Sequence, residues 1–414
     1  MERSTGSNMQ IQGQRTQSTA IFKVQQEPSI KIEPTVGEQL LRKLFQIIFF
    51  VQLFLVSILV IVLTIRGLIY AGSTDRFHPK KWYPPLLVST ASAGIVSFIW
   101  QSITFHCPSK AIKAVFWFTP LLTCAVGVLH ILIGSPLSLA AVYSSFSVTG
   151  IGGATATGTS LDIAFIVVIL LSFLWSMQVI KNMLYVTISR IRYMNFACGV
   201  DINTRAAFHD TVKHLVGSVC IGSAIVPVIG TIRGSARAIN LVAGDNDEFL
   251  FSCADCYSGF ASTLITYGNR WGFVHVGVYN KGFIQASADT WEMFKRVELI
   301  SLIDSDLTGV FCFLSGVAVG SICGIVGGTW ELIIHKGYAT EVSIYAFLIG
   351  YFMCRIALAW QQASVSAYYV SYAENPQSLR FDATIPVRIE QLHRLKNASL
   401  CRNHLLNLEN GDRL

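Results

Sequence analysis

Charged residues are scarce in this chain of 414 residues, since only 13% are Asp, Glu, Lys or Arg, whereas 52% are hydrophobic. Soluble domains carry about one quarter charged residues, so a soluble chain of this composition would leave apolar surface uncovered. The same numbers exclude a wholly disordered chain, collagen, a coiled coil and a small disulfide-linked secreted domain. A helical membrane protein that crosses the bilayer several times remains.

Paired cysteines, long basic runs and catalytic motifs are missing as well. The ten cysteines are scattered singly apart from Cys253 and Cys256, and one CxxC without a second pair is too little for a structural zinc site. No basic run resembles a nucleic-acid-binding arm, despite the formal net charge of +7. The phosphate-binding loop, GxSxG, HExxH and the dinucleotide fingerprint are all missing. We therefore expect no enzyme, catalytic residue, metal, cofactor or nucleic-acid partner.

Long apolar segments dominate what is present. A membrane-spanning helix needs about 20 apolar residues, and eight segments approach or exceed that length, so we predict an all-α, polytopic transmembrane helical bundle. The sixth segment is the weakest, because it contains Asp255. The eight predicted spans are residues 44–65, 84–105, 114–133, 163–180, 215–232, 249–269, 307–330 and 342–373.

Polar ends flank the predicted bundle. We expect residues 1–43 to be a disordered cytosolic tail without a signal peptide, residues 44–373 to form the bundle, and residues 374–414 to be a second cytosolic tail. With eight spans and both tails inside, 23 of the 31 Lys and Arg residues fall on the inner side, as the positive-inside rule requires.

Two uncharged or aromatic segments resist assignment. In residues 134–160, 15 of the 27 residues are Gly, Ser or Thr, which gives little driving force for membrane insertion. Residues 271–294 are aromatic but interrupted by polar side chains, so we expect an interfacial or re-entrant helix there.

Three short motifs follow one another in the second half of the chain. They are WSMQVIKN at residues 175–182, Asn269-Arg270, and YNKGF at residues 279–283. Together they resemble the choline transporter-like family of solute carriers, which includes the Pns-type proteins of fungi and plants. Gly and Asn are exchanged around Lys281 relative to the family pattern. The motif residues are Gln178, Lys181, Asn182, Asn269, Arg270, Lys281 and Phe283.

The resemblance implies a ten-span bundle that moves choline or a related quaternary or primary amine by alternating access. It implies a multi-pass protein of the plasma membrane, with Golgi or endosomal membranes as the alternative. Eight spans instead of ten suggest a shortened chain, and the two missing spans would fall at residues 135–159. Whether a chain with eight spans can transport therefore stays open. The alternative function is a non-transporting membrane scaffold or trafficking factor of the same family.

A choline-like substrate calls for aromatic faces and one negative charge, because a quaternary ammonium cannot donate a strong hydrogen bond. Asp255 is the acid inside a predicted span and could meet the substrate or pair with Arg355. The ordinary alternative for the aromatic side chains is an interfacial belt. The aromatic candidates are Trp175, Trp271, Tyr279 and Trp330, with Trp360, Tyr368 and Tyr369 beside them.

Two further features have structural interpretations. Lys181 and Asn182 end the fourth predicted span, and we expect a structural joint there, with Lys181 reaching the inner headgroups. The seventh span carries a glycine every four residues, a stripe that lets another helix approach closely for static packing or for sliding. These glycines are Gly316, Gly320, Gly324 and Gly328.

Overall fold

The computed structural model describes residues 36–70, 79–115 (except 109, 112 and 113), 160–243, 248–334 and 339–394 (except 382 and 393). Most of these described residues are helical, and none of them lies in a β-strand. Six helical segments are long and apolar enough to cross a membrane, which confirms the predicted all-α polytopic fold. They are Val36–Leu63, Leu87–His106, Val167–Cys198, Thr204–Ala236, Ile300–Ile334 and Val342–Glu374.

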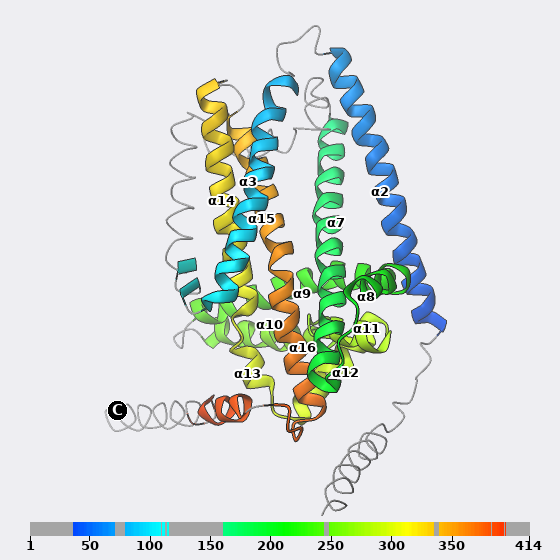
Figure 1. Cartoon of the computed structure of the whole chain (residues 1–414), viewed down its shortest axis with the longest axis vertical. Helices are drawn as coiled ribbons and strands as arrows, with labels where there is room; N and C mark the ends of the chain where they lie inside the picture. The colour runs from blue at the N-terminus through cyan, green and yellow to red at the C-terminus, as the bar shows by residue number, and fades with distance from the viewer. Residues whose placement is uncertain are drawn as a thin grey trace, which may run out of the picture. The chain divides into compact units, whose positions relative to one another are not determined.

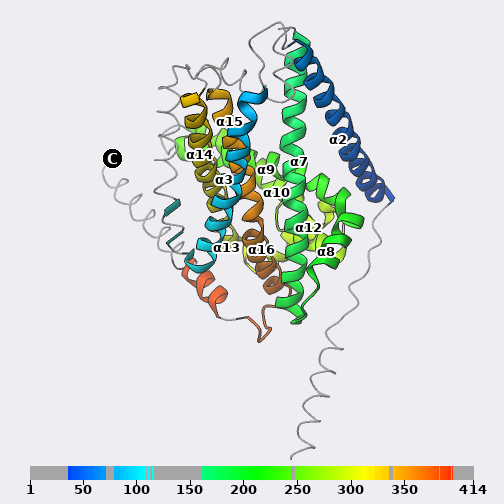
Figure 2. The same ribbon diagram turned by 45° about the horizontal axis from the view of Figure 1, so that its top comes forward.

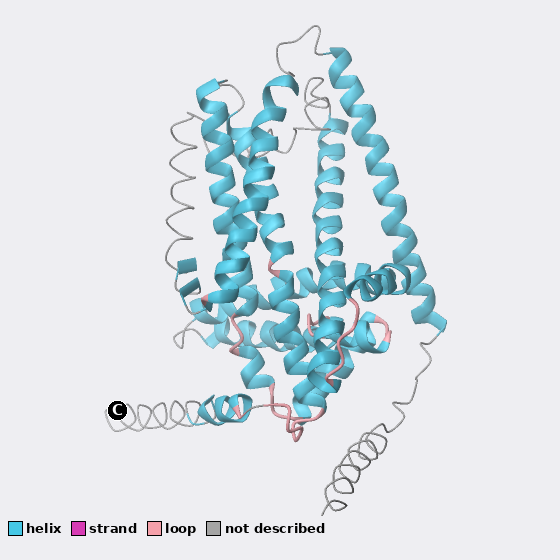
Figure 3. Ribbon diagram, in the orientation of Figure 1, coloured by secondary structure: helices cyan, strands magenta, loops and turns pink. Residues whose placement is uncertain are grey.

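Five long helices run along the vertical axis of Figure 1. They are α2 (Val36–Tyr70), α3 (Pro79–His106), α7 (Ser160–Tyr193), α14 (Thr308–Ile334) and α15 (Ala339–Ala357). The described loops that join the helices lie mostly in the lower half of the view in Figure 3. The described connections therefore gather toward one end of the long helices.

Two predicted spans do not appear among the six candidates. Residues 114–133 lie almost wholly outside the described residues, as does the segment 134–160 in which the missing pair of spans was expected. The predicted span at 249–269 forms the helix α10 (Glu248–Tyr267), and the side chains of its first half, Asp255 included, lie outside the described residues. Each of the other six predicted spans coincides with a candidate.

The first helix begins earlier than the hydropathy pattern suggests. α2 starts at Val36, so residues 36–43 continue the helix where a disordered tail was expected. The reason is that Glu38, Gln39, Leu40 and Leu41 all favour helix, although their mean hydropathy is below that of a membrane span.

Short helices follow α7. The chain passes through a π-helical turn, η1 (Met194–Cys198), into α8 (Thr204–Asp210), where the Asn203 side chain accepts a hydrogen bond from Arg205 N. A second π-helical turn, η2 (Thr211–Leu215), leads into α9 (Val216–Ala243). Because a π turn accommodates one extra residue, each of these turns rotates the faces that follow it.

The segment predicted to be interfacial or re-entrant forms two helices. α11 (Gly272–Tyr279) and α12 (Phe283–Arg296) are both too short to cross a bilayer. α13 (Ile300–Asp304) then leads into α14. Figure 1 shows α8 to α13 gathered toward the lower part of the long helices, and Figure 2 shows α8 and α12 beside α7.

α14 and α15 make the most extensive contact of any two described helices. A methyl group on Gly320 would lie 2.8 Å from the carbonyl oxygen of Phe347, and one on Gly324 would lie 3.1 Å from that of Ser343. The Ser343 hydroxyl also donates a hydrogen bond of 3.0 Å to the Gly324 carbonyl. Two glycines of the stripe, Gly320 and Gly324, therefore lie against the backbone of α15, whereas Gly316 lies against the side chains of Tyr351 and Arg355. Leu358 then ends α15, and α16 (Ala359–Glu374) continues in the same direction.

Candidate functional site

Asp306 lies in the turn between α13 and α14, and its carboxylate is almost completely buried, with 4% of the side chain exposed. It accepts a hydrogen bond of 2.9 Å from the Thr308 amide and another from the Thr308 hydroxyl, so it caps the first residue of α14 from the position just before Leu307. The same carboxylate forms an ion pair with Arg270. A capping residue therefore also brings negative charge into the bundle.

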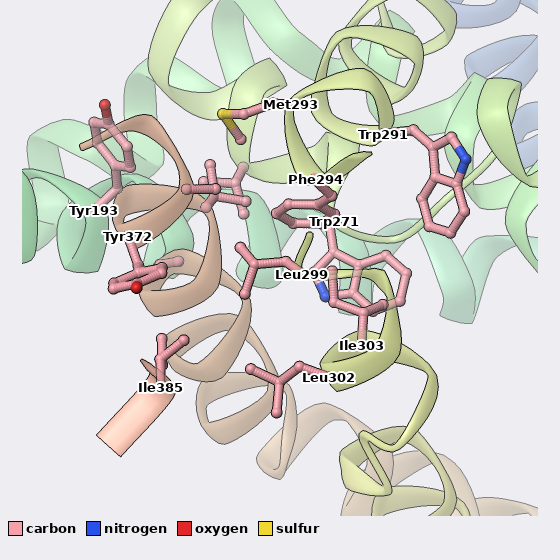
Figure 4. Packing of buried hydrophobic residues seen from close by; sticks show 14 of the residues in the cluster. Tyr193, Trp271, Trp291, Met293, Phe294, Leu299, Leu302, Ile303, Tyr372 and Ile385 are labelled. Carbon is pink, nitrogen blue, oxygen red and sulfur yellow. The ribbon is translucent and has the colours of Figure 1, made fainter. Parts of the chain in front are cut away.

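Arg270 belongs to the Asn-Arg motif and lies between α10 and α11. Besides pairing with Asp306, its guanidinium lies 4.7 Å from the ring centroid of Trp271. Trp271 is 5% exposed and packs against Trp291 and Phe294, as Figure 4 shows. One face of this predicted substrate-binding indole is thus occupied by a cation of the chain itself.

Asn269 connects the three helices α10, α11 and α12, whose meeting point is called the joint below. Its side-chain amide donates a hydrogen bond of 2.8 Å to the Ser287 carbonyl in α12, and its Oδ1 accepts one of 3.0 Å from the Gly272 amide. A methyl group on Gly272 would lie 2.8 Å from Cα of Ser287, so α11 and α12 meet at backbone contact. The Asn-Arg motif consequently fixes α10, α11 and α12 around Asp306.

A cavity of about 1110 Å³ opens beside Asp306. Aromatic rings from three helices line it, namely Phe105 of α3, Phe311 of α14, and Trp360 and Tyr369 of α16. The rings of Phe105 and Trp360 lie 5.5 Å apart. The helical residues 384–391 close another side and contribute Arg388. Aromatic faces around one buried carboxylate suit a small organic cation.

A second carboxylate cluster lies at the end of α16. Glu374 accepts hydrogen bonds from the hydroxyls of Tyr193 and Tyr279, and its Oε1 lies 3.1 Å from Nε2 of His275. The Tyr193 and Tyr279 hydroxyls lie 2.9 Å apart. Burial raises the pKa of Tyr279 above its usual value, and the Glu374 charge raises it further. Tyr279 therefore remains a hydrogen-bond donor at neutral pH.

The other predicted aromatic residues lie apart from one another. Trp175 packs against Phe49 of α2 at 5.6 Å, and its indole nitrogen donates to the Cys220 carbonyl. Trp330 lies toward the far end of α14, 41% exposed. Twenty-four residues of helix, about 36 Å, separate it from Asp306. The structure therefore does not bring Trp175, Trp271, Tyr279 and Trp330 into one site.

The remaining motif residues make structural contacts. Asn182 donates a hydrogen bond of 2.9 Å to the Ser223 hydroxyl and so joins α7 to α9. Lys281 pairs with Asp289 at 2.6 Å and lies 5.7 Å from the ring centroid of Tyr279. Phe283 is 1% exposed in the core, and Gln178 is half-buried on α7.

Sequence reasoning did not single out Asp306 or Glu374. Each stands one residue outside a predicted span, at 307–330 and at 342–373, where acidic residues ordinarily mark the polar boundary. For Asp306 a signal existed, because Asp followed two residues later by Thr at the start of an apolar run is typical of a helix N-cap. No local signal pointed to Glu374, whose partners come from distant segments.

Comparison with known proteins agrees with the family resemblance of the sequence motifs. The family model described as plasma-membrane choline transporter matches residues 105–377, which include Asp306, Glu374 and all four aromatic residues named for the cavity. Protein PNS1 of Mycosarcoma maydis is 25% identical over 254 residues, covering 58% of this chain and 48% of that protein.

Two further relatives give similar figures. Protein PNS1 of Neurospora crassa is 26% identical over 233 residues, covering 53% of this chain and 42% of that protein. A CTL-like protein of Dictyostelium discoideum is 24% identical over 220 residues, covering 50% of this chain and 38% of that protein. The chain thus spans about half the length, or less, of the curated relatives it matches.

Proposed function

Because the chain belongs to the choline transporter-like family, we propose that it moves choline or a related small amine across a membrane by alternating access. The membrane assignment rests on the six candidate spans and on the family. The plasma membrane, with both chain ends in the cytosol, is the proposed setting. A protease-protection assay on a C-terminal tag tests this orientation, which protection of the tag from cytosolic protease would contradict.

The aromatic cavity beside Asp306 is the observation that supports this proposal most directly. A quaternary ammonium offers no strong hydrogen-bond donor, and each desolvated aromatic face contributes about 0.5–2 kcal/mol to its binding. Phe105, Tyr369 and Trp360 supply such faces around the Asp306 carboxylate, and one side of the Trp360 ring is already covered by Arg192, whose guanidinium lies 5.5 Å from the ring centroid. The family match and the chemistry of the cavity therefore favour the same class of substrate.

The Asp306–Arg270 pair gives a physical reason for a conformational change. Arg270 neutralises Asp306 in the structure described here. A substrate cation in the cavity would share the same carboxylate and weaken its attraction for Arg270. Arg270 belongs to the segment that connects α10, α11 and α12. A weaker attraction between Arg270 and Asp306 would therefore favour a different position of these three helices relative to α14. Substrate binding and helix rearrangement are then coupled through one carboxylate.

Uptake of labelled choline into proteoliposomes tests the proposal. We expect Trp360→Leu to lower uptake about tenfold, because leucine remains apolar but lacks the aromatic face, worth about 1–2 kcal/mol. Trp271→Ala and Tyr279→Ala are predicted to weaken uptake indirectly, because Trp271 packs against Arg270 and the Tyr279 hydroxyl donates to Glu374. Trp330→Leu is the matched control, since it makes the same change on an exposed position of α14 and should retain the uptake of the unmodified protein.

Two results would contradict this account in different ways. Full uptake by folded Trp360→Leu protein would place the substrate outside this cavity. An unmodified protein that is folded but takes up no choline would favour the alternative function, a non-transporting membrane scaffold or trafficking factor.

A further inference from the structure

Three cationic side chains from different elements converge on one face of α14. Arg270 precedes α11, Arg355 lies in the last turn of α15, and Lys181 belongs to α7. Glycines on α14 leave the space that the two arginines occupy. A methyl group on Gly309 would lie 2.5 Å from Nη1 of Arg270, and one on Gly316 would lie 3.1 Å from Cγ of Arg355.

Those two glycines are seven residues apart, so they share one face of the helix. Cys312 lies between them on that face, is 2% exposed, and is within direct electrostatic reach of all three cations. The charges of Arg355 and Arg270 also act directly on the Lys181 ammonium. Lys181 therefore faces this cluster, a different environment from the headgroup contact expected from the sequence.

The cluster carries more positive than negative charge. Asp306 is the acid that faces it, and Asp306 is already paired with Arg270. Among the described residues neither Lys181 nor Arg355 forms an ion pair. Nη1 of Arg355 and Nε of Arg270 are buried without a hydrogen-bond partner. Uncompensated charge and unpaired guanidinium groups are costly inside a membrane protein, so an anion bound among these side chains would lower that cost.

The cluster is not fully enclosed. Lys181, Arg270 and Arg355 are half-buried residues, and 19% of the Arg270 side chain is exposed. A guanidinium presents its N–H groups as a planar fork that matches the two oxygens of a carboxylate or phosphate, and an ammonium adds a point charge. Nη1 of Arg355 and Nε of Arg270 are buried donors without a partner, and an oxyanion inside the cluster would accept hydrogen bonds from them.

We propose that Lys181, Arg270 and Arg355 form a binding site for a small oxyanion, a carboxylate or a phosphate group. A soluble anion and the phosphate of a lipid headgroup share this chemistry. The site is distinct from the aromatic cavity, whose lining includes none of the three cations, and its existence does not depend on choline transport.

Thermal unfolding of the full chain in detergent tests the site, with sodium phosphate compared with sodium chloride at equal ionic strength. A ligand that binds the folded state alone raises the unfolding temperature in a saturable way. We expect phosphate to raise this temperature by several degrees over chloride in the unmodified protein. Lys181→Arg should retain the shift, because arginine keeps the charge and adds donors.

Lys181→Gln is the decisive variant. It should lose the phosphate shift, yet without phosphate it should unfold at the same or a higher temperature than the unmodified protein, because it removes repulsion from Arg270 and Arg355. A lysine with a merely structural role would lower the temperature instead. Lys213→Gln is the matched control, since Lys213 is exposed on η2, and it should retain the full shift.

A second measurement distinguishes a lipid headgroup from a soluble anion as the source of the oxyanion. Here the unfolding temperature is measured in phosphatidylcholine bilayer discs with or without phosphatidic acid. A Lys181-dependent shift with phosphatidic acid alone assigns a lipid headgroup, and one with inorganic phosphate alone assigns a soluble anion. No shift in either arm, or equal shifts in the unmodified protein and Lys181→Gln, would overturn the proposal. An absence of choline uptake would leave these shifts unchanged.

Discussion

Two regions of this bundle hold their helices together by different means. Between α14 and α15 the contact is made by small residues, and the backbones meet at Gly320 and Gly324 with the Ser343 hydroxyl as the polar contribution. Around α11 and α16 the contact is made by buried polar groups, above all the Asp306–Arg270 pair and the hydrogen bonds to Glu374.

The difference follows from the solvent. Lipid tails are as apolar as leucine, so hydrophobicity alone gives two membrane helices no reason to associate. Close van der Waals packing and interhelical hydrogen bonds are the alternatives, and this protein uses one in each region. The glycine region tolerates no added volume, whereas the polar region tolerates no loss of charge balance. An added side chain should therefore destabilise the contact between α14 and α15, and a removed charge should destabilise the polar region around α11 and α16.

The largest effect is expected at Asp306. Asp306→Asn keeps the cap on Thr308 but removes the negative charge, which leaves Arg270 buried without its counter-charge. We expect the free energy of unfolding to fall by about 3–5 kcal/mol, measured by chemical denaturation in detergent micelles. The double variant Asp306→Asn with Arg270→Met should recover most of this loss, because it removes the orphaned charge. A double variant no more stable than the single one would contradict the charge explanation.

Gly320→Leu should have the next largest effect. The new side chain would meet the carbonyl oxygen and ring of Phe347, where a methyl group already comes within 2.8 Å of that oxygen, so α14 and α15 must separate. Overpacking of this kind costs about 1–3 kcal/mol, which a thermal unfolding assay in detergent would detect as a lower midpoint. Gly230→Leu is the control, because a methyl group there meets nothing within 4 Å. An unchanged midpoint for Gly320→Leu would show that α15 does not lie on this stripe.

The smallest effect is expected at the joint of α7 and α9. Asn182 donates to Ser223, and both side chains are buried. A double-mutant cycle with Asn182→Ala and Ser223→Ala should give a coupling free energy of about 0.6–1.7 kcal/mol, the range seen for hydrogen bonds between membrane helices. Choline uptake should persist in Ser223→Ala, since this bond lies away from the aromatic cavity. Coupling indistinguishable from zero would assign Asn182 a different role.

The sequence predicted the fold better than the site. Hydropathy predicted all six candidate spans of the described residues, because an apolar run of sufficient length has few alternatives to a membrane helix. The pairing of Arg270 with Asp306 spans 36 residues and depends on how α13 turns into α14, which no local pattern encodes. The cation over Trp271 comes from the adjacent residue outside a regular helix, so periodicity gives no sign of it.

The acidic residues also show why the sequence predicts the fold better than the site. Asp255 was singled out because it lies within a predicted span, and its side chain lies outside the described residues. Asp306 and Glu374 stand just beyond predicted spans, and the structure buries their carboxylates nonetheless, with 4% and 24% of the side chain exposed. A one-residue difference at a helix end decides between an ordinary boundary acid and an internal charge, and helix ends are the least predictable part of a sequence.

The tight contact between α14 and α15 also bears on the order of assembly. The two helices are neighbours along the chain, so closing this hairpin costs little loop entropy, and it can form as soon as both have been synthesised. The contact of α16 with α7 joins segments roughly 180 residues apart and must wait for nearly the whole chain. Once closed, the hairpin offers a finished surface to α3, which contacts both of its helices. The glycine stripe thus acts early in biogenesis, whereas the charged joint is completed among the last contacts.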